Sequence, residues 1–430
     1  MRRNSFPRRP SIRIPERVDV PTARLATLGN GVRLYLLENH DQQVVRLSFV
    51  FGAGSSRQTT LFSATSAANL LSEGSDRFTA RQIAEQLDFY GSYFDIAVDR
   101  DVVVVSFCAL SKFVMPTLQT AEEILLRPSF PQQEFDSYRI KRRQRLEIER
   151  RKVDVRVREV DVRVREAFAA AMFGADHPYG ISAPEAAYDT LTREAVVDFY
   201  RRHYTADNCF VVCSGDLSDE ALAAIENICV QLPQSGDRNE LHFPAMVQTP
   251  RVRLEHAGAV QSAVRVGRML FTRNHPDYVG MQVVATVLGG YFGSRLMRNL
   301  REERGYTYGV FAGMVNLDRA GYLAIATQVA EAAREDTLHQ IYTEIERLRT
   351  ESISEQELSL VKNIMVGEMM RILDGPFGIV DVTIENVQCG TDNHAVERTV
   401  EAIRRCTPED VQRLAEKYLR REDLVEVTVG

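Results

Sequence analysis

The end of the first half of this chain resembles the end of the whole chain. In residues 191–215 a threonine at the second position is followed by an acidic first turn, an amphipathic helix and a closing strand that ends in glycine. Residues 406–430 repeat this order, with Thr192 and Thr407 as the equivalent N-caps, about 215 residues apart. A repeat of this length predicts that one fold is written twice in the sequence.

A second pair of similar segments lies upstream of the first pair. A helical pattern at residues 118–126 precedes Gln133-Glu134-Phe135, and a helical pattern at 338–348 precedes Gln356-Glu357-Leu358. Residues 231–250 contain prolines and a glycine among polar residues, which is typical of a linker between domains. The predicted organisation is an N-terminal extension (1–24), a first domain (25–230), a linker (231–250) and a second domain (251–430).

Both halves mix strand-like alternation with longer helical stretches, which indicates an α+β fold rather than a doubly wound sheet. We expect antiparallel strands backed by helices. In the first half the predicted strands are 32–37, 44–51, 101–108 and 209–213, and the predicted helices are 64–72, 80–89, 115–126 and 133–151.

Composition narrows the class of protein. The chain has 430 residues, 44% of them hydrophobic and 26% charged, which suits a globular protein of two or three domains. Its formal net charge of −6 argues against nucleic acid as a partner. Neither an export signal nor an apolar run long enough to span a bilayer is visible, and six dispersed cysteines suit a reducing compartment. We expect a cytoplasmic protein, with the periplasm as the alternative.

A glycine-rich loop in the second half carries the first family resemblance. Gly289, Gly290 and Gly293 precede a helical pattern that contains Arg301, and Tyr308 follows seven residues later. The segment 288–310 resembles the glycine-rich loop, helix and strand in the C-terminal domain of M16 peptidases, the family of insulinase and the mitochondrial processing peptidase (MPP). The resemblance implies that the Arg and Tyr hold the substrate backbone and the developing oxyanion.

Local patterning supports that layout. We expect a helix over residues 294–304 that ends at Gly305, followed by a strand on which Tyr306 and Tyr308 share a face. The plainer interpretation is a surface arginine at a helix end and a half-buried tyrosine. The glycine loop lacks the spacing and the lysine of a phosphate-binding loop. Its plainer interpretation is a structural tight turn.

The first half departs from the family at its metal site. Active M16 peptidases place His-x-x-Glu-His on a helix, with the two histidines binding zinc and the glutamate acting as general base. Residues 51–57 and 73–75 resemble the flanks of that helix, but the five motif positions hold other residues. They are Thr65, Ser66, Ala67, Ala68 and Asn69. Glu147 and Glu149 lie near the position of the third, carboxylate ligand, and we interpret them as solvated helix charges.

No histidine pair in the chain has zinc-motif spacing, since the eight histidines are never closer than about 14 residues. His177-Pro178-Tyr179-Gly180 resembles a structural turn of the family. Residues 139–166 are rich in arginine and contain Val-Asp-Val-Arg-Val-Arg-Glu twice in succession. Their apolar positions favour a helix with a solvated basic face, and contact with an acidic partner surface is the alternative.

Taken along the chain, the resemblance implies two homologous LuxS/MPP-like metallohydrolase domains, each an antiparallel sheet backed by helices. In some M16 peptidases one chain carries the zinc motif and its partner carries the Arg and Tyr. The resemblance therefore implies a zinc-free subunit that binds an unfolded peptide and supplies Arg301 and Tyr308 in trans. It implies no metal or cofactor in this chain, zinc in a heterodimeric partner, and a homodimer as the alternative when isolated. The rival hypotheses are a non-enzymatic scaffold or peptide-binding protein, and a self-sufficient metalloenzyme with an unorthodox site.

Overall fold

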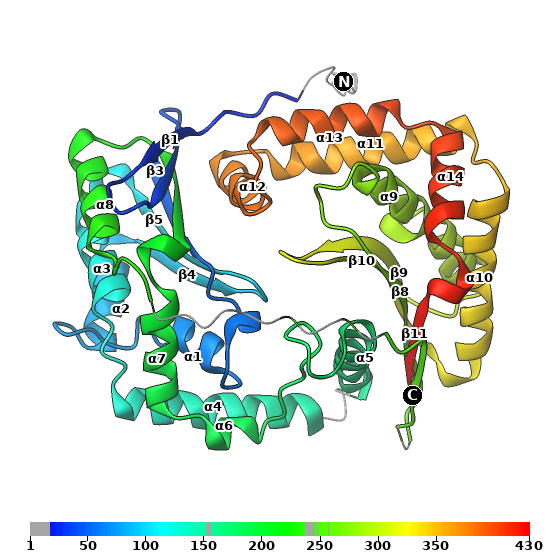
Figure 1. Ribbon diagram of the computed structural model, residues 1–430, viewed down its shortest axis with the longest axis horizontal. Helices are drawn as coiled ribbons and strands as arrows, with labels where there is room; N and C mark the ends of the chain where they lie inside the picture. The colour runs from blue at the N-terminus through cyan, green and yellow to red at the C-terminus, as the bar shows by residue number, and fades with distance from the viewer. Residues whose placement is uncertain (1–17, 152–155, 237–242, 244–245, 247, 257) are drawn as a thin grey trace, which may run out of the picture.

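The computed structural model describes residues 18–151, 156–236, 243, 246, 248–256 and 258–430. A six-stranded sheet with its helices occupies the first half (Figure 1). Its elements are β1 (Arg24–Thr27), β2 (Arg33–Glu38), β3 (Val44–Phe51), α1 (Ser63–Asn69), α2 (Ala80–Tyr90), β4 (Tyr93–Val98), β5 (Val103–Leu110), α3 (Val114–Leu126), α4 (Gln132–Arg151), α5 (Arg156–Phe173), α6 (Ala187–Thr190), α7 (Arg193–His203), β6 (Cys209–Gly215) and α8 (Asp219–Gln231).

The second half holds a five-stranded sheet and its own helices. Its elements are β7 (Arg251–Leu254), β8 (Gln261–Leu270), α9 (Tyr278–Ala285), the π-helical turns η5 (Thr286–Gly290) and η6 (Met297–Glu303), β9 (Val310–Asn316), β10 (Gly321–Ala330), α10 (Arg334–Thr350), α11 (Glu355–Ile372), α12 (Pro376–Gln388), α13 (His394–Arg405), α14 (Pro408–Tyr418) and β11 (Val425–Val429).

The two sheets share one topology, as the sequence repeat predicts. The first runs β1-β2-β6-β3-β5-β4 and the second β7-β11-β8-β10-β9, so five strands follow the same order once β1 is set aside. Neither sheet is purely antiparallel, which corrects the expectation. The closing strand returns beside the first one, so β6 pairs in parallel with β2 and β11 in parallel with β7.

Local chemistry explains where the repeated helices begin. The Thr192 hydroxyl accepts the Ala195 N–H at 3.2 Å at the start of α7. Thr407 forms a reciprocal box at the start of α14, accepting the Asp410 N–H at 3.2 Å and donating its own N–H to Asp410 at 3.1 Å. Each cap satisfies a backbone donor that the helix itself leaves free. The predicted N-caps of both copies are confirmed.

Each sheet is covered on its inner face by a helix from the other half of the chain. In Figure 1, α5 and α12 lie between the two sheets, while α3 and α8 lie outside the first sheet and α10 and α14 outside the second. Helix α5 packs on β8 and β11, and α12 packs on β6. Since α5 and α12 hold equivalent places in the repeat, the two halves exchange helices reciprocally.

Buried apolar side chains join each exchanged helix to its sheet. Val160, Val164 and Phe168 of α5 share a core with Val425 and Val427 of β11. The predicted helix over the arginine-rich repeat is therefore confirmed from Arg156 onward, and its apolar face packs inside the protein. The first copy of the repeat lies mostly outside the described residues.

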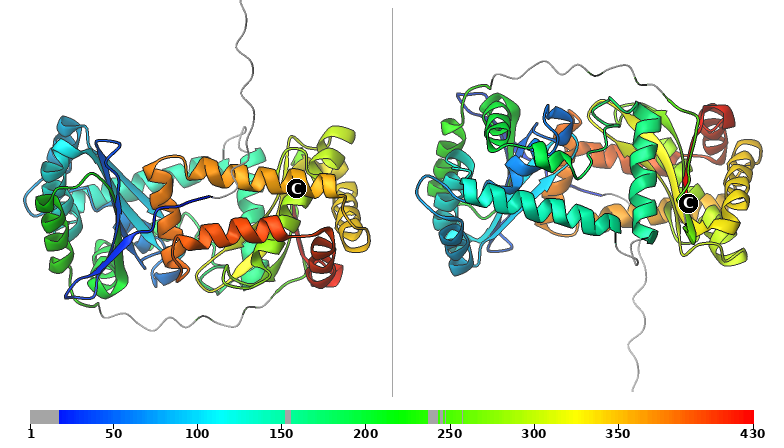
Figure 2. Two further views of the ribbon diagram at one scale, coloured as in Figure 1. Left: turned by 90° about the horizontal axis from the view of Figure 1, so that it is seen from above. Right: turned by 90° about the horizontal axis from the view of Figure 1, so that it is seen from below.

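Helix α12 makes the corresponding core on the first sheet. Its buried Val380 and Ile384 cluster with Val50 of β3 and with Phe210 and Val212 of β6. These side chains leave water only when both halves are folded. Figure 2 shows the same arrangement from above and below, with α4 leading from the first sheet toward α5.

The predicted N-terminal extension joins the second half where it is described. Val18 and Val20 are buried in the same core as Val396 and Val400 of α13. The Asn393 side chain donates to the Pro21 carbonyl at 2.8 Å. Residues 18–23 therefore lead from the second core to β1.

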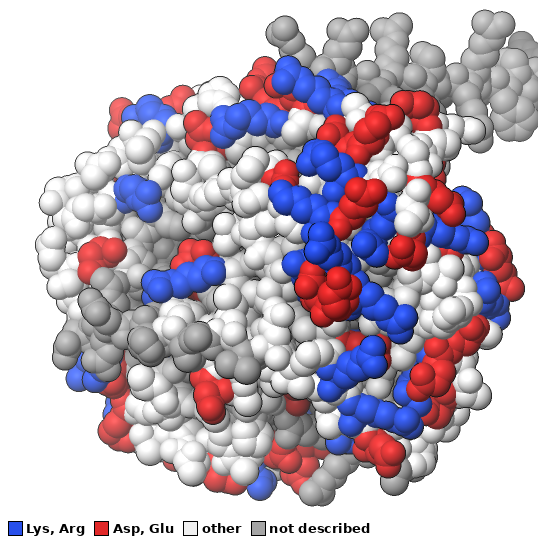
Figure 3. Space-filling view, turned by 45° about the vertical axis from the view of Figure 1, so that its right-hand side comes forward, with Lys and Arg blue, Asp and Glu red and all other residues white. Residues whose placement is uncertain are grey.

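Charges of both signs are interspersed over the outer helices of the second half (Figure 3). Many of them pair within one helix, for example Arg371 with Glu368 at 2.7 Å and Arg413 with Asp410 at 2.8 Å. Exposed pairs of this kind contribute little to stability but keep the surface solvated. Within the residues the structure describes, we find no helix whose length and apolar character would let it traverse a lipid bilayer.

Candidate functional site

The glycine-rich loop begins as a continuation of α9. The π-helical turn η5 brings Gly289 against β9, where a Cβ added to this residue would lie 2.8 Å from the Ala312 backbone and side chain. Only glycine permits this approach. At Gly290 and Gly293 an added Cβ would meet Thr286 at 3.1 Å and the Tyr291 ring at 3.0 Å, which is tight but less restrictive. Close packing of the loop on the sheet thus explains Gly289.

The helix that follows differs from the predicted one in its pitch. Most of its length, η6, is π-helical rather than α-helical. Gly305 ends it with φ of 66°, as predicted, and the Tyr306 N–H donates to the Leu300 carbonyl at 2.9 Å across that turn. A π-helical turn widens the backbone and re-aims the side chains near its end, and such turns are frequent at functional sites.

Arg301 lies in the last turn of η6 and differs from its neighbours in what it contacts. Its guanidinium carbon is 4.2 Å from the ring centroid of Phe292, a side chain that is 62% exposed. Among the described residues, Arg301 has no hydrogen-bond or ion-pair partner. An aromatic face attracts a cation without occupying its N–H donors. The donors of Arg301 therefore stay available to a ligand.

Two other arginines of this segment are bound to carboxylates. Arg295 makes two hydrogen bonds to Glu357 of α11, at 2.9 and 3.0 Å. Arg304 lies 3.6 Å from Asp336 of α10 and donates to Asn299 at 2.8 Å. These contacts fix the segment to the helices behind it. They also separate structural arginines from Arg301.

Tyr306 and Tyr308 do not share a strand face, which corrects the prediction. Strand β9 begins only at Val310. Tyr306 turns back and donates to Asp336 at 2.9 Å, whereas Tyr308 is 94% exposed. The Thr307 hydroxyl donates to the Gly309 carbonyl at 2.8 Å and accepts the Gly309 N–H at 3.0 Å, so a local turn replaces the strand ladder.

The positions that the sequence analysis predicts to be a degenerate metal site lie on the short helix α1. Thr65 and Asn69 are half-buried, and Ala68 is fully buried in the first core. The Asn69 amide donates to the Thr65 carbonyl at 2.7 Å. Zinc in such sites needs imidazole, thiolate or carboxylate ligands, and these side chains offer none of them. Across the residues that the structure describes, no group of three His, Cys, Asp or Glu side chains is arranged to hold a metal ion.

Arg142 of α4 contacts helix α1, whereas Glu147, near the expected position of the third zinc ligand, lies beside Arg143. The Arg142 guanidinium donates to the Asn69 side-chain oxygen at 3.0 Å. Glu147 lies instead 3.9 Å from Arg143, which also contacts Asp189 of α6. The Glu149 side chain lies outside the described part of the structure. Sequence reasoning missed Arg142, because nothing in the local pattern links it to Asn69.

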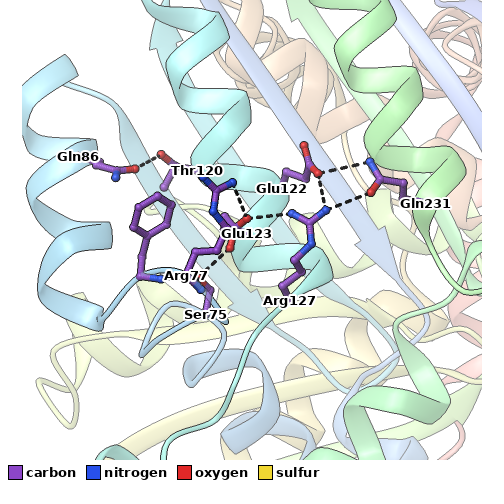
Figure 4. Close-up of polar contacts among 9 residues, drawn as sticks. Ser75, Arg77, Gln86, Thr120, Glu122, Glu123, Arg127 and Gln231 are labelled. Carbon is purple, nitrogen blue, oxygen red and sulfur yellow. Dashed lines mark hydrogen bonds and ion pairs between the residues drawn. The ribbon is translucent and has the colours of Figure 1, made fainter.

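The turn after α1 is fixed by a buried carboxylate (Figure 4). Glu123 of α3 is 2% exposed and accepts the Ser75 hydroxyl at 3.0 Å. Arg127 donates to Glu123 at 2.8 Å, and Arg77 lies 3.5 Å from it. Gly74 adopts a φ of 140° beside this network, a conformation that favours glycine. The turn at Gly74 and Ser75 is therefore bound to α3 through Glu123.

The His-Pro-Tyr-Gly segment helps to join the two halves. The Tyr179 hydroxyl donates to one oxygen of Asp101 at 2.6 Å, and the Asp318 N–H donates to the other at 2.9 Å. Burial and the neighbouring Asp101 carboxylate raise the pKa of Tyr179 well above its usual value. The tyrosine therefore stays a neutral donor, which supports the structural role predicted for this turn.

Comparison with known proteins finds similarity to peptidase M16 proteins. The family described as the peptidase M16 inactive domain matches residues 190–365, which include the glycine loop, Arg301 and Tyr308. An uncharacterized zinc protease of Mycobacterium tuberculosis is 24% identical over 272 residues, 59% of each chain. A probable mitochondrial-processing peptidase subunit beta of Arabidopsis thaliana is 21% identical over 434 residues, covering 96% of this chain and 79% of the plant protein.

Solved structures share the whole fold. The peptidase M16 inactive domain from Pseudomonas fluorescens superposes with a TM-score of 0.82 at 22% identity, over 95% of this chain and 98% of that one. A protease from Helicobacter pylori gives a TM-score of 0.83 at 15% identity, over 96% and 100% of the two chains. These matches show that the chain has the fold of those proteins and that residues 190–365 resemble the peptidase M16 inactive domain.

Proposed function

We propose that this chain is the zinc-free subunit of a two-chain M16 metallopeptidase and completes the active site of a zinc-bearing partner. One observation carries the proposal. Arg301 rests on Phe292 with its donors unoccupied among the described residues, while Arg295 and Arg304 on the same segment are bound by carboxylates. A cation with free donors, seven residues before a tyrosine that is 94% exposed, suits a role toward a ligand better than a role in the fold.

Arg301 and Tyr308 supply complementary donors in this proposal. The guanidinium is permanently charged and presents a planar fork of N–H groups to a peptide carbonyl. The Tyr308 hydroxyl, 94% exposed, adds a neutral donor. Donors aimed at the oxygen on which charge develops are a large source of catalytic stabilisation. Zinc in the partner would supply the activated water, and this chain would orient the scissile bond.

In this proposal the first half of the chain bounds the space that holds the peptide and does not form a second catalytic centre. Helix α1 lacks zinc ligands at the predicted positions, and the turn that follows it is bound to Glu123. An unfolded peptide would lie between this chain and a partner with His-x-x-Glu-His. The heterodimer is the proposed working form, and a homodimer is the form expected when the chain is isolated.

Reconstitution tests the proposal. The isolated chain is mixed with an M16 chain that carries His-x-x-Glu-His, and hydrolysis of a fluorogenic unstructured peptide is followed. We expect the mixture to be active and the isolated chain inactive. Arg301→Ala should lower kcat/KM of the mixture at least tenfold, since one lost oxyanion donor typically costs about 100-fold or more. Arg298→Ala, an exposed arginine one turn earlier, is the matched control and should leave the rate unchanged.

The tyrosine has its own control. Tyr308→Phe should reduce the rate, whereas Tyr93→Phe, another exposed tyrosine, should not. Full activity with Arg301→Ala and Tyr308→Phe would contradict the assigned roles. A stable complex that never hydrolyses peptide would favour the non-enzymatic scaffold instead.

A further inference from the structure

We infer that the Arg142 guanidinium takes the place of the metal ion at α1 and closes this site to divalent cations. Asn69 stands at the position of the second zinc-binding histidine, and its side-chain oxygen accepts from Arg142 at 3.0 Å. The amide of Asn69 is bound to Thr65, the position of the first histidine, at 2.7 Å. One cation from α4 thus binds the Asn69 side chain, which is itself held to the Thr65 backbone carbonyl.

An aromatic ring lies beside this guanidinium. Its central carbon lies 5.3 Å from the ring centroid of Tyr138, one turn earlier on α4. Tyr188 of α6 is buried close by, stacked on Phe62 with ring centroids 4.0 Å apart. Phe62 immediately precedes α1 and holds a φ of 66°, which is unusual for a residue other than glycine. The Tyr138 ring therefore packs on Arg142, and a stacked pair of rings adjoins the start of α1.

A guanidinium can replace the charge and the cross-linking role of a metal ion, but not its chemistry toward water. It carries a permanent positive charge and can cross-link two helices through directed hydrogen bonds. It has no acidic proton to lose near neutral pH and cannot activate water. A divalent ion placed beside it would meet a fixed like charge in a partly buried site. The inference concerns α1 and α4 alone and does not depend on Arg301 or Tyr308.

Metal binding to a restored histidine pair tests this inference. Thr65→His/Asn69→His places two imidazoles four residues apart on α1, the spacing that binds zinc on a helix. Zinc affinity is measured by calorimetry with and without Arg142→Gln, which keeps a hydrogen-bond donor and removes the charge. We expect the additional Arg142→Gln change to tighten zinc binding at least tenfold.

An exposed helix provides the matched control. Arg81→His/Glu85→His builds the same spacing on α2, where both native side chains are exposed. Arg142→Gln should not change zinc binding at that pair. Equal zinc affinity of the α1 pair with and without Arg142 would overturn the inference.

A single substitution keeps the inference testable if the histidine variant does not fold. Asn69→Asp places a carboxylate against Arg142, so it should raise the melting temperature, and zinc should give no further rise. The combination Asn69→Asp/Arg142→Gln should lose that gain. A zinc-dependent rise in the melting temperature of Asn69→Asp would show that the site accepts a metal and would also overturn the inference.

Discussion

The guanidinium of Arg301 lies 4.2 Å above the ring of Phe292, and this contact separates Arg301 from every other arginine described on its segment. Phe292 belongs to the glycine-rich loop and Arg301 to the end of η6, so the ring connects the two parts of the predicted motif. A 62% exposed phenylalanine has little to gain from its own burial. Support of the arginine is a physical reason for its position.

Phe292→Leu should therefore weaken the reconstituted peptidase without unfolding the chain. A cation–π contact at an exposed site contributes about 0.5–1 kcal/mol, so we expect a two- to fivefold loss in kcat/KM. Phe292→Tyr keeps an aromatic face and should restore the rate. Phe89→Leu, which alters an 81% exposed phenylalanine elsewhere, is the control. Loss of activity with Phe292→Tyr equal to that with Phe292→Leu would rule out the ring as the support.

Much of the fold follows from short-range patterns in the sequence. The threonine caps of α7 and α14, the repeated order of strands and the glycine that ends η6 are all local features. The reciprocal exchange of α5 and α12 is not. The apolar face of α5 was visible, but a periodic pattern says only that a face is buried and cannot say against which sheet.

The sequence predicted the positions of the candidate site residues but not all of their contacts. The positions of Arg301 and Gly289 followed from the family motif, whereas the turn at Tyr308 arose because the Thr307 hydroxyl competes for the Gly309 backbone. Arg142 contacts Asn69 across 73 residues of sequence. Contacts of this range depend on the assembled fold and leave no periodic signal.

Removal of the buried carboxylate that binds the turn after α1 should destabilise the protein. Glu123→Ala leaves Ser75 and part of Arg127 without their partner, and we expect a loss of about 2 kcal/mol in the free energy of unfolding. Glu122→Ala, which removes a more exposed partner of Arg127, should cost less. Urea denaturation of both variants measures the difference. Equal losses would contradict a central role for Glu123.

Asp277 should stabilise the protein near neutral pH, and this contribution should be lost in acid. Its carboxylate accepts from Lys417 at 2.8 Å and from Tyr418 at 2.7 Å, and these bonds hold its pKa below the ordinary 3.8. A depressed pKa adds stability above 3.8 that is lost as the pH falls through the folded value. Wild type should therefore exceed Asp277→Asn in stability at pH 6, and the difference should vanish near pH 2. A gap independent of pH would contradict the linkage.

A cavity in α12 should loosen the sheet of the other half. Ile384→Ala removes a buried side chain packed with Phe210 and Val212, at a cost of about 2–5 kcal/mol. Hydrogen exchange should then show lost protection in β2 and β6, although the change lies in the second half of the chain. Protection lost only in the second half would contradict the exchange of helices.

The most direct test of the account combines zinc content with peptidase activity of the isolated chain. The purified protein is assayed for bound zinc and for hydrolysis of an unstructured peptide, before and after addition of a partner with His-x-x-Glu-His. We predict no stoichiometric zinc and no hydrolysis alone, and hydrolysis dependent on Arg301 in the mixture. One zinc per isolated chain, with activity that a chelator abolishes, would contradict the account.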